Sequence, residues 1–253
     1  MSDAPPQRVP TRIYLILSVV FVAVVIGAFW VKTRPTAVTS SFTRSESTEA
    51  LLARGIREYN TGAYDAAMEL YHQVLKQEPA EPHAHYDLGL IFAARGQSVQ
   101  AQWEYEAALK ADPKFLEARL NLGVELYRQR QFAPAAEAFR QVLQASPNHP
   151  LGLFDLGISL FQLGQVEEAR RWLTAAVRED PKRVDAHYYL GVALERQRRY
   201  ADAKASLQKA LELAPGHIDA WVALARVYSA LGERGPAEEA RAKAVQLNPA
   251  LKQ

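Results

Sequence analysis

The sequence predicts an all-α protein, an α-solenoid of six helix-turn-helix repeats preceded by a single transmembrane helix. Two observations lead to this prediction. From residue 48 to residue 251 the chain repeats itself with a period of 34 residues and no insertion. Before the repeats, residues 13–31 form a run of 19 uncharged, mostly apolar residues.

The charge balance argues against a nucleic-acid partner. The chain has a formal charge of +2, but residues 48–251 carry 24 Lys and Arg against 26 Asp and Glu. Because the repeats are not basic, we expect no nucleic-acid partner. The chain has no cysteine, which excludes disulfides and thiolate zinc sites but fits a reducing or an oxidising compartment.

Residues 13–31 have the length and composition of a membrane span. As a helix they would be about 28 Å long, close to the hydrocarbon thickness of a bilayer. Tyr14 and Trp30 lie near the two ends, where amphipathic rings favour the headgroup level. A cleaved signal peptide is the alternative. It normally ends in small residues, whereas here Trp30 and Val31 precede Lys32 directly.

The segments around this span carry little apolar surface. Residues 1–12 contain three prolines and are expected to be a disordered tail, and the Ser- and Thr-rich residues 32–47 a flexible linker. Basic residues occur on both sides of the span, so the charge rule does not settle its orientation. We expect a single-pass protein of a bacterial cytoplasmic (inner) membrane, with the repeats on the outer, periplasmic side.

The repeats divide into six units, 48–81, 82–115, 116–149, 150–183, 184–217 and 218–251. In each unit, apolar residues recur at helical spacing in two stretches, which predicts two helices. Three positions of the unit hold the same type of residue throughout. Position 8 holds Gly55, Gly89, Gly123, Gly157, Gly191 and Ala225; position 20 holds Ala67, Ala101, Ala135, Ala169, Ala203 and Ala237; position 32 holds Pro79, Pro113, Pro147, Pro181, Pro215 and Pro249.

These positions have mechanical roles. Small side chains at positions 8 and 20 let the two helix axes approach closely, and the proline at position 32 ends the second helix. Position 15 holds glycine in four units, which permits a tight turn between the helices: Gly62, Gly96, Gly164 and Gly232.

This pattern resembles the tetratricopeptide repeat family, which has the same period and the same small, aromatic and proline positions. The resemblance implies a right-handed solenoid of antiparallel helix pairs. It also implies that the first helices line an inner concave surface that binds a protein or peptide.

The first unit departs from the pattern, because Arg54 and Glu58 occupy positions that are apolar in the other units. We interpret it as a polar outer cap. A shifted register for the helix that begins near Ser47 is the alternative.

No motif for covalent chemistry is present. His83 and His85 are two residues apart, whereas a metal pair on a helix needs a spacing of three or four. His85 and His187 share position 4 with Trp221, which favours packing. There is no phosphate-binding loop and no nucleophile elbow. We therefore expect no enzyme, no cofactor, no metal site and no small-molecule substrate.

The resemblance places positions 5, 9 and 12 of the first helices on the inner surface. Ten candidate binding residues follow: Tyr86, Leu90, Leu120, Val124, Tyr127, Phe154, Ile158, Phe161, Tyr188 and Val192. A contiguous exposed apolar strip usually marks a binding site. For each residue, packing between neighbouring hairpins is the alternative.

The expected function is that of a membrane-anchored scaffold or adaptor. It would hold a protein or peptide segment in its apolar groove, contact the bilayer through residues 13–31, and assemble or stabilise a membrane-associated complex. A holdase-like chaperone for unfolded clients is the alternative. Family members that bind acidic tails use a clamp of Lys, Asn and Arg, from which this chain departs at Tyr86, Leu90 and Asp155.

Overall fold

The computed structural model describes residues 46–252. The predicted tail (1–12), the predicted transmembrane helix (13–31) and nearly all of the predicted linker (32–47) lie outside this range. None of the helices between residues 46 and 252 is long and apolar enough to span a membrane.

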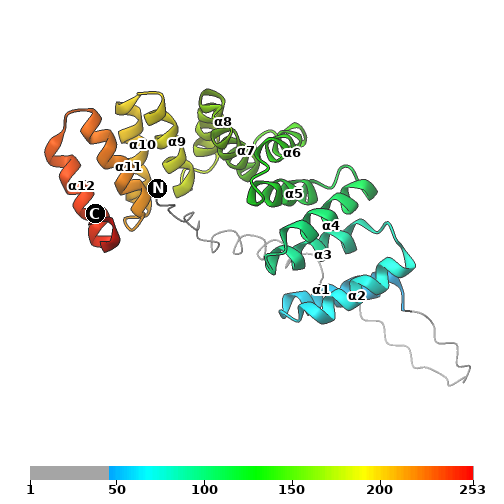
Figure 1. The fold of residues 1–253 in the computed structure, drawn as a ribbon. Coiled ribbons are helices and arrows are strands. Elements are labelled where there is room, and N and C mark those ends of the chain that lie inside the picture. The colour runs from blue at the N-terminus through cyan, green and yellow to red at the C-terminus, as the bar shows by residue number, and fades with distance from the viewer. Residues whose placement is uncertain (1–45, 253) are drawn as a thin grey trace, which may run out of the picture. The chain divides into compact units, whose positions relative to one another are not determined.

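The described chain is all-α, as predicted, and forms six consecutive helical hairpins (Figure 1). Its helices are α1 (Thr48–Asn60), α2 (Tyr64–Gln77), α3 (Pro82–Ala94), α4 (Ser98–Ala111), α5 (Leu116–Arg128), α6 (Phe132–Ala145), α7 (Pro150–Gln162), α8 (Val166–Glu179), α9 (Val184–Arg196), α10 (Tyr200–Leu213), α11 (Ile218–Ala230) and α12 (Arg234–Leu247), followed by a 3-10 turn, η1 (Pro249–Lys252). Each helix contacts the one before it and the one after it.

Local sequence explains where these helices begin. Pro82 and Pro150 open α3 and α7, where the missing amide proton costs no hydrogen bond. The first helices of four hairpins have a side-chain N-cap, provided by Ser47, Glu81, His149 and His217.

The turns inside the hairpins share one left-handed backbone geometry. The four predicted glycines have φ between 73° and 80°. In the other two hairpins the same position of the turn holds Arg130 and Arg198, at φ 63° and 59°. Arginine carries a Cβ atom, which disfavours this region. The turn geometry is therefore set by the hairpin, and two arginines adopt it at some cost in strain.

The glycines at position 8 serve close helix packing. The large side chain at position 24 of the second helix lies over each of them, as Tyr71 lies over Gly55 and Phe139 over Gly123. The Gly55 contact matches that of the later units, so α1 keeps their register. Arg54 in α1 points outward and pairs with Glu46, in agreement with a polar cap.

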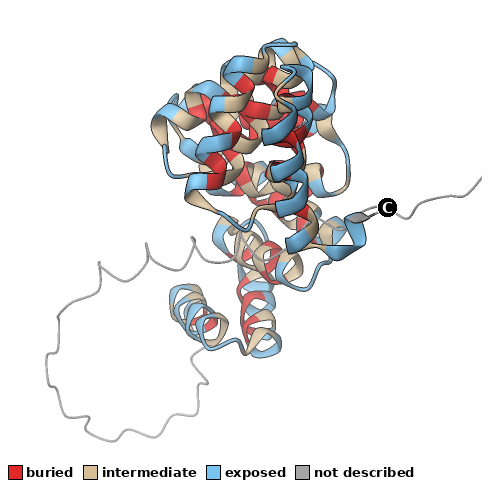
Figure 2. Ribbon diagram, turned by 90° about the vertical axis from the view of Figure 1, so that its left-hand side faces the viewer, coloured by how far each residue is buried: buried red, intermediate tan, exposed pale blue. Residues whose placement is uncertain are grey.

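Buried residues lie on the facing sides of the helices (Figure 2). They form two apolar clusters. One joins residues of α1, α2 and α3, and the other runs from Leu120 in α5 to Val227 in α11. The α4 residues Ala101, Tyr105 and Ala108 are buried as well, and α4 contacts both α3 and α5.

Candidate peptide-binding face

The first helices of successive hairpins approach one another. Contacts join α1 to α3, α5 to α7, α7 to α9 and α9 to α11. At the remaining step, Asn121 of α5 donates a hydrogen bond to the Tyr86 hydroxyl of α3, at 3.2 Å. The first helices therefore form one continuous layer, which we call the inner face.

Six of the ten predicted binding residues are half-buried, so part of each side chain meets solvent. They are Tyr86, Leu90, Val124, Tyr127, Tyr188 and Val192. Leu90, Val124 and Val192 share position 9, and in the first unit Ile56 extends this column with an exposed fraction of 39%. These residues form the accessible apolar part of the inner face.

The other four predicted residues are buried, which corrects the prediction for them. Leu120, Phe154, Ile158 and Phe161 have exposed fractions of 9% or less. Phe154 and Phe161 both pack edge-on against Tyr189, and their ring centroids lie 6.0 and 6.1 Å from that of Tyr189. Phe154 and Phe161 therefore belong to the packing between α7 and α9. Leu120 is buried in α5, and the apolar column of position 9 is interrupted at the buried Ile158.

Arginines cover both phenylalanines. The guanidinium carbon of Arg183 lies 5.0 Å from the ring centroid of Phe154, and that of Arg196 lies 3.9 Å from that of Phe161. At these distances a cation is attracted to the aromatic face. Arg196 thus places a positive charge where a solvent-facing apolar ring was predicted.

Beside Arg196 the surface is hollowed. A depression of about 360 Å³ is lined by Val192, Glu195, Arg196, Tyr200, Arg226 and Ala230. Its two facing charges form a bidentate pair, because Nε and one terminal nitrogen of Arg226 each donate to Glu195 at 2.8 Å. Of the predicted residues, only Val192 lines this depression.

Sequence reasoning missed two carboxylates at position 6, the half-buried Asp87 in α3 and the buried Asp155 in α7. Burial raises the pKa of Asp87 to about 6, against the opposing effects of Tyr71 and His83. It raises the pKa of Asp155 to about 7, against the opposing charge of Arg183. A polar residue recurring at one inner-face position among apolar neighbours was the signal available in the sequence.

The two histidines at position 4 join neighbouring hairpins. The imidazoles of His85 and His187 lie 3.1 and 3.0 Å from the carbonyl oxygens of Pro79 and Pro181 in the preceding units. Trp221 donates to the Pro215 carbonyl in the same way, at 2.8 Å. Among residues 46–252, no group of three or more His, Asp or Glu side chains is arranged to hold a metal ion.

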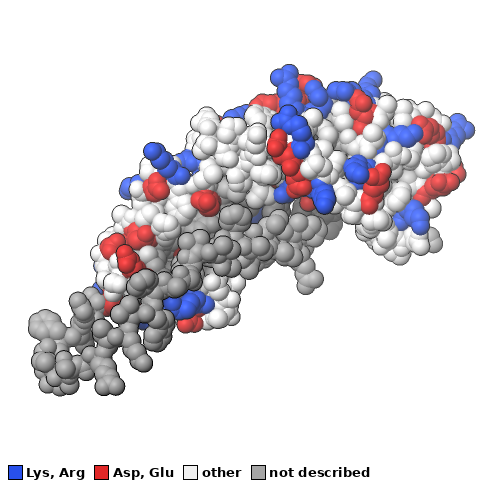
Figure 3. Space-filling model, turned by 180° about the vertical axis from the view of Figure 1, so that it is seen from behind, with Lys and Arg blue, Asp and Glu red and all other residues white. Residues whose placement is uncertain are grey.

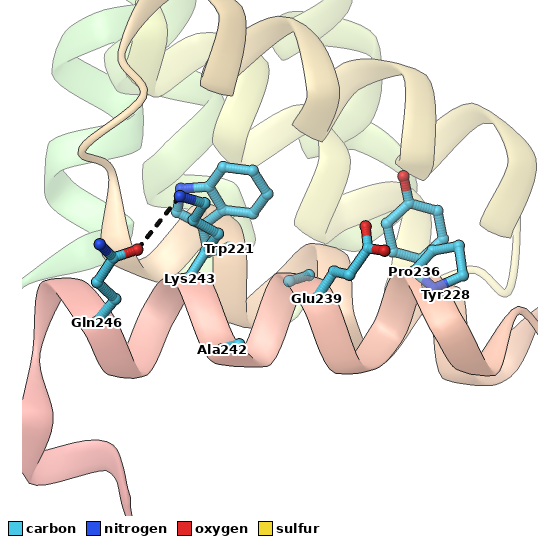
Figure 4. A pocket seen from close by; sticks show the side chains of 8 residues that line it. Trp221, Tyr228, Pro236, Glu239, Ala242, Lys243 and Gln246 are labelled. Carbon is cyan, nitrogen blue, oxygen red and sulfur yellow. Dashed lines mark hydrogen bonds between the residues drawn. The ribbon is translucent and has the colours of Figure 1, made fainter.

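A larger hollow, of about 520 Å³, lies between α11 and α12 (Figure 4). Trp221 and Tyr228 face Lys243 and Glu239 across it, and Lys243 donates a hydrogen bond to Gln246. Small residues of α12, including Ala240 and Ala242, leave this space open. None of the predicted binding residues lines it.

Charges of both signs alternate on the surface seen in Figure 3, where Lys and Arg side chains lie beside Asp and Glu. Typical pairs are Arg199 with Asp202, at 2.6 Å, and Lys204 with Glu233, at 2.8 Å. Where Figure 3 shows described residues, they form no continuous basic stripe of the kind that tracks a nucleic-acid backbone.

Consecutive hairpins in chain order, with the first helices in one layer, define an α-solenoid repeat protein. Family models described as "Tetratricopeptide repeat" match residues 60–114, 100–150, 154–218 and 194–250. The chain belongs to the tetratricopeptide repeat family.

Solved structures share the fold at low sequence identity. YrrB, described as "a TPR protein with an unusual peptide-binding site", is 21% identical with a TM-score of 0.63, and the match covers 71% of this chain and 92% of that one. PilF of Pseudomonas aeruginosa is 19% identical with a TM-score of 0.68, covering 80% and 92%. MamA is 23% identical with a TM-score of 0.61, covering 66% and 92%. No curated protein gave a significant match.

Proposed function

We propose that this chain is an interaction scaffold whose inner face holds a segment of another protein. Residues 13–31 anchor it in a bacterial cytoplasmic membrane with the repeats on the periplasmic side, and its role is to assemble or stabilise a membrane-associated complex. The chain itself carries out no covalent chemistry. The peptide-binding site named for YrrB supports this use of the fold.

The half-exposed column of Leu90, Val124 and Val192 is the observation that carries the proposal. Each residue comes from a different hairpin, so the column runs along the first helices from α3 to α9, interrupted at the buried Ile158 of α7. Tyr86, Tyr127 and Tyr188 flank it, and their rings offer contact area at low entropic cost. An extended or helical segment with spaced apolar side chains fits such a track.

Photo-crosslinking from the inner face tests the proposal. A benzophenone amino acid replaces Val124 or Val192 in the full chain in intact membranes, and Glu137, exposed on α6, serves as the control position. We expect the two inner-face positions to crosslink one shared partner that the control does not capture. Crosslinks to many unrelated unfolded chains would indicate a holdase and not an adaptor. The same crosslinked proteins at all three positions would overturn the inner-face site.

A paired variant tests whether the contact is needed. Val124→Glu with Val192→Glu places two charges in the contact, where an unpaired charge costs several kcal/mol, and should abolish partner capture. Because both side chains reach solvent, helicity should survive. Ile158 is avoided because it is buried and a glutamate there would disturb the core.

Protease accessibility tests the membrane part of the proposal independently. Protease added to spheroplasts should digest the repeats. Protection of the repeats while an outer-face control protein is digested would reverse the orientation, and release of the intact chain without detergent would remove the anchor.

A further inference from the structure

The column of position 9 changes from apolar to charged at its end. It holds an aliphatic side chain in the first five hairpins and Arg226 in the sixth. Arg226 of α11 and the half-exposed Val192 of α9 both line the depression of about 360 Å³ on the inner face. The apolar track therefore ends at a hollow that contains a cation.

The depression is lined by more cations than anions. The guanidinium groups of Arg196 and Arg226 stand against one carboxylate, that of Glu195. The other three lining side chains are uncharged. A small anion that enters the depression therefore meets a net positive charge.

The pair with Glu195 leaves part of the Arg226 guanidinium available. Glu195 accepts hydrogen bonds from Nε and one terminal nitrogen of Arg226, both at 2.8 Å. These bonds use two of the five N–H groups that a guanidinium carries. The Arg226 side chain has an exposed fraction of 53%, so a ligand can approach its other N–H groups from solvent.

Arg196 forms no ion pair or hydrogen bond with any other residue in 46–252. Its guanidinium carbon lies 3.9 Å from the ring centroid of Phe161, and the residue is exposed. A guanidinium over an aromatic ring keeps its N–H groups at its planar edge, where they can still donate to an acceptor. Phe161 thus positions this cation without neutralising it.

We propose that the depression binds the carboxylate of an aspartate or glutamate side chain in the segment that the inner face holds. An apolar side chain of the segment packs on Val192, and the carboxylate accepts hydrogen bonds from Arg196 and Arg226. Such charge-assisted bonds are roughly twice as strong as neutral ones. This inference rests on the proposed function, since it names the chemistry of one residue of the bound segment.

The same lining disfavours a basic side chain. Both oxygens of Glu195 already accept from Arg226, and the Glu195 side chain has an exposed fraction of 18%. A lysine or arginine would have to displace Arg226 from Glu195, and it would be repelled by Arg196. The depression therefore discriminates between acidic and basic residues.

The stacking of the hairpins sets the spacing within the segment. Val192 lies on α9 and Arg226 on α11, and these helices are in contact. Packed helices lie about 8 to 10 Å apart. An extended peptide advances about 3.3 Å per residue, which puts the acidic residue about three positions from the apolar one.

The test uses four fluorescein-labelled peptides of leucine, alanine and serine and the full chain purified in detergent. Three are amidated at the C-terminus and carry glutamate, glutamine or arginine about three positions after a leucine. The fourth carries glutamine there as its last residue, with a free terminal carboxylate. Fluorescence anisotropy gives the affinities.

We expect the glutamate peptide to bind at least about tenfold more tightly than the amidated glutamine peptide, which is the size of one charged hydrogen bond. The arginine peptide should bind most weakly. Added salt should weaken the binding of the glutamate peptide more than that of the glutamine peptide, because it screens exposed charges.

Substitutions connect this preference to the depression. Arg196→Gln should lower the affinity of the glutamate peptide about tenfold and leave that of the amidated glutamine peptide unchanged. Arg171→Gln is the matched control, since it removes the same charge from an exposed position of α8 and should change neither affinity. Glu195→Gln with Arg226→Gln removes the second cation without leaving an unpaired carboxylate, and should also reduce the preference for glutamate.

The possible failures are distinguishable. Equal binding of the amidated peptides that Val124→Glu with Val192→Glu abolishes would overturn the acidic preference and keep the inner-face site. Absence of binding by all four peptides would overturn both. Tight binding of the free-carboxylate peptide alone would overturn the assignment to a side chain.

A preference for glutamate that survives in Arg196→Gln and in the double variant of Glu195 and Arg226 would overturn the depression as its site. The peptide comparison is made on the unaltered chain, so it decides the acidic preference even if a variant were to fold poorly.

Discussion

Gly89 of α3 lies directly against the ring of Tyr105 of α4. A Cβ atom at Gly89 would come within 2.5 Å of the Tyr105 Cε1 atom. The ring cannot move away freely, because Tyr105 has an exposed fraction of 1% and packs against Tyr86 at a centroid distance of 5.9 Å. The close packing of α3 on α4 therefore requires a residue without a side chain at position 89.

Gly89→Ala should destabilise the repeats although alanine favours helix. The helix propensity gain is about 1 kcal/mol, whereas overpacking in a full core typically costs about 1 to 3 kcal/mol. Chemical denaturation of residues 46–253, followed by circular dichroism, measures the balance. Gly235→Ala is the matched control, since Gly235 lies in α12 with no atom within 4 Å of its Cβ position. It should be neutral or stabilising, and an equal midpoint for both variants would contradict the packing described for Gly89.

The strained turns predict a stabilising change. Arg130→Gly and Arg198→Gly should each raise the free energy of unfolding by about 1 kcal/mol, because glycine adopts positive φ without a steric penalty. Both side chains are exposed and their positive φ values are 63° and 59°. Arg171→Gly, on the exposed side of α8, should lower stability by about 1 kcal/mol. The idea fails if the turn and helix variants shift the denaturation midpoint in the same direction.

Asp155 predicts a pH dependence of stability. Its pKa rises from 3.8 in the unfolded chain to about 7 in the folded protein, so the folded state binds more protons between these values. Its contribution to stability is therefore complete below about pH 4 and is lost as the pH rises through 7. The difference amounts to roughly 2 to 4 kcal/mol.

Urea denaturation at pH 5 and pH 8 checks this sign. The free energy of unfolding of Asp155→Asn, relative to that of the unaltered chain, should be greater at pH 8 than at pH 5. The charged group facing Asp155 is Arg183, and the phenols of Tyr127 and Tyr189 stay neutral in this range. Asp65→Asn, at an exposed position, should leave the pH profile unchanged. If the stability of Asp155→Asn varied with pH in the same way as that of the unaltered chain, the Asp155 carboxyl would have the same pKa in the folded and unfolded states.

The hydrogen bond that Trp221 donates to the Pro215 carbonyl should stabilise the junction between the fifth and sixth hairpins. Trp221→Phe replaces the indole by a smaller aromatic ring without the N–H donor to the Pro215 carbonyl, and the lost hydrogen bond should cost about 1 kcal/mol. Hydrogen exchange at the amides of α11 and α12 should accelerate in this variant, while α1 to α4 remain unchanged. Uniform acceleration along the whole array would mean that the bond does not act locally.

Most of the fold follows from local rules that the sequence displays. Proline at position 32, glycine at position 15 and the small residue at position 8 each act within one hairpin, so a period of 34 residues is enough to place every helix between residues 48 and 247. The residues 13–31 that indicate a membrane helix lie outside the described range, and that prediction stays a prediction.

The binding face was harder to predict because it depends on contacts between hairpins. Position 6 holds Tyr189 in the fifth unit, whereas the other units have smaller residues there: Ala53, Asp87, Asn121, Asp155 and Ala223. Tyr189 is large enough to pack against both Phe154 and Phe161, which converts two inner-face positions into core. The helical period assigns a residue to a face, but the size of a neighbour 28 or 35 residues away decides whether that residue meets solvent.

The buried residues of α4 have a mechanical consequence. Ala101, Tyr105 and Ala108 fill the space beside α3, and α4 contacts both α3 and α5. Tyr86 of α3 also contacts Tyr105 of α4 and Phe115, which precedes α5. A stack that is packed at every step passes a displacement of one hairpin on to its neighbours, as interlocking plates do.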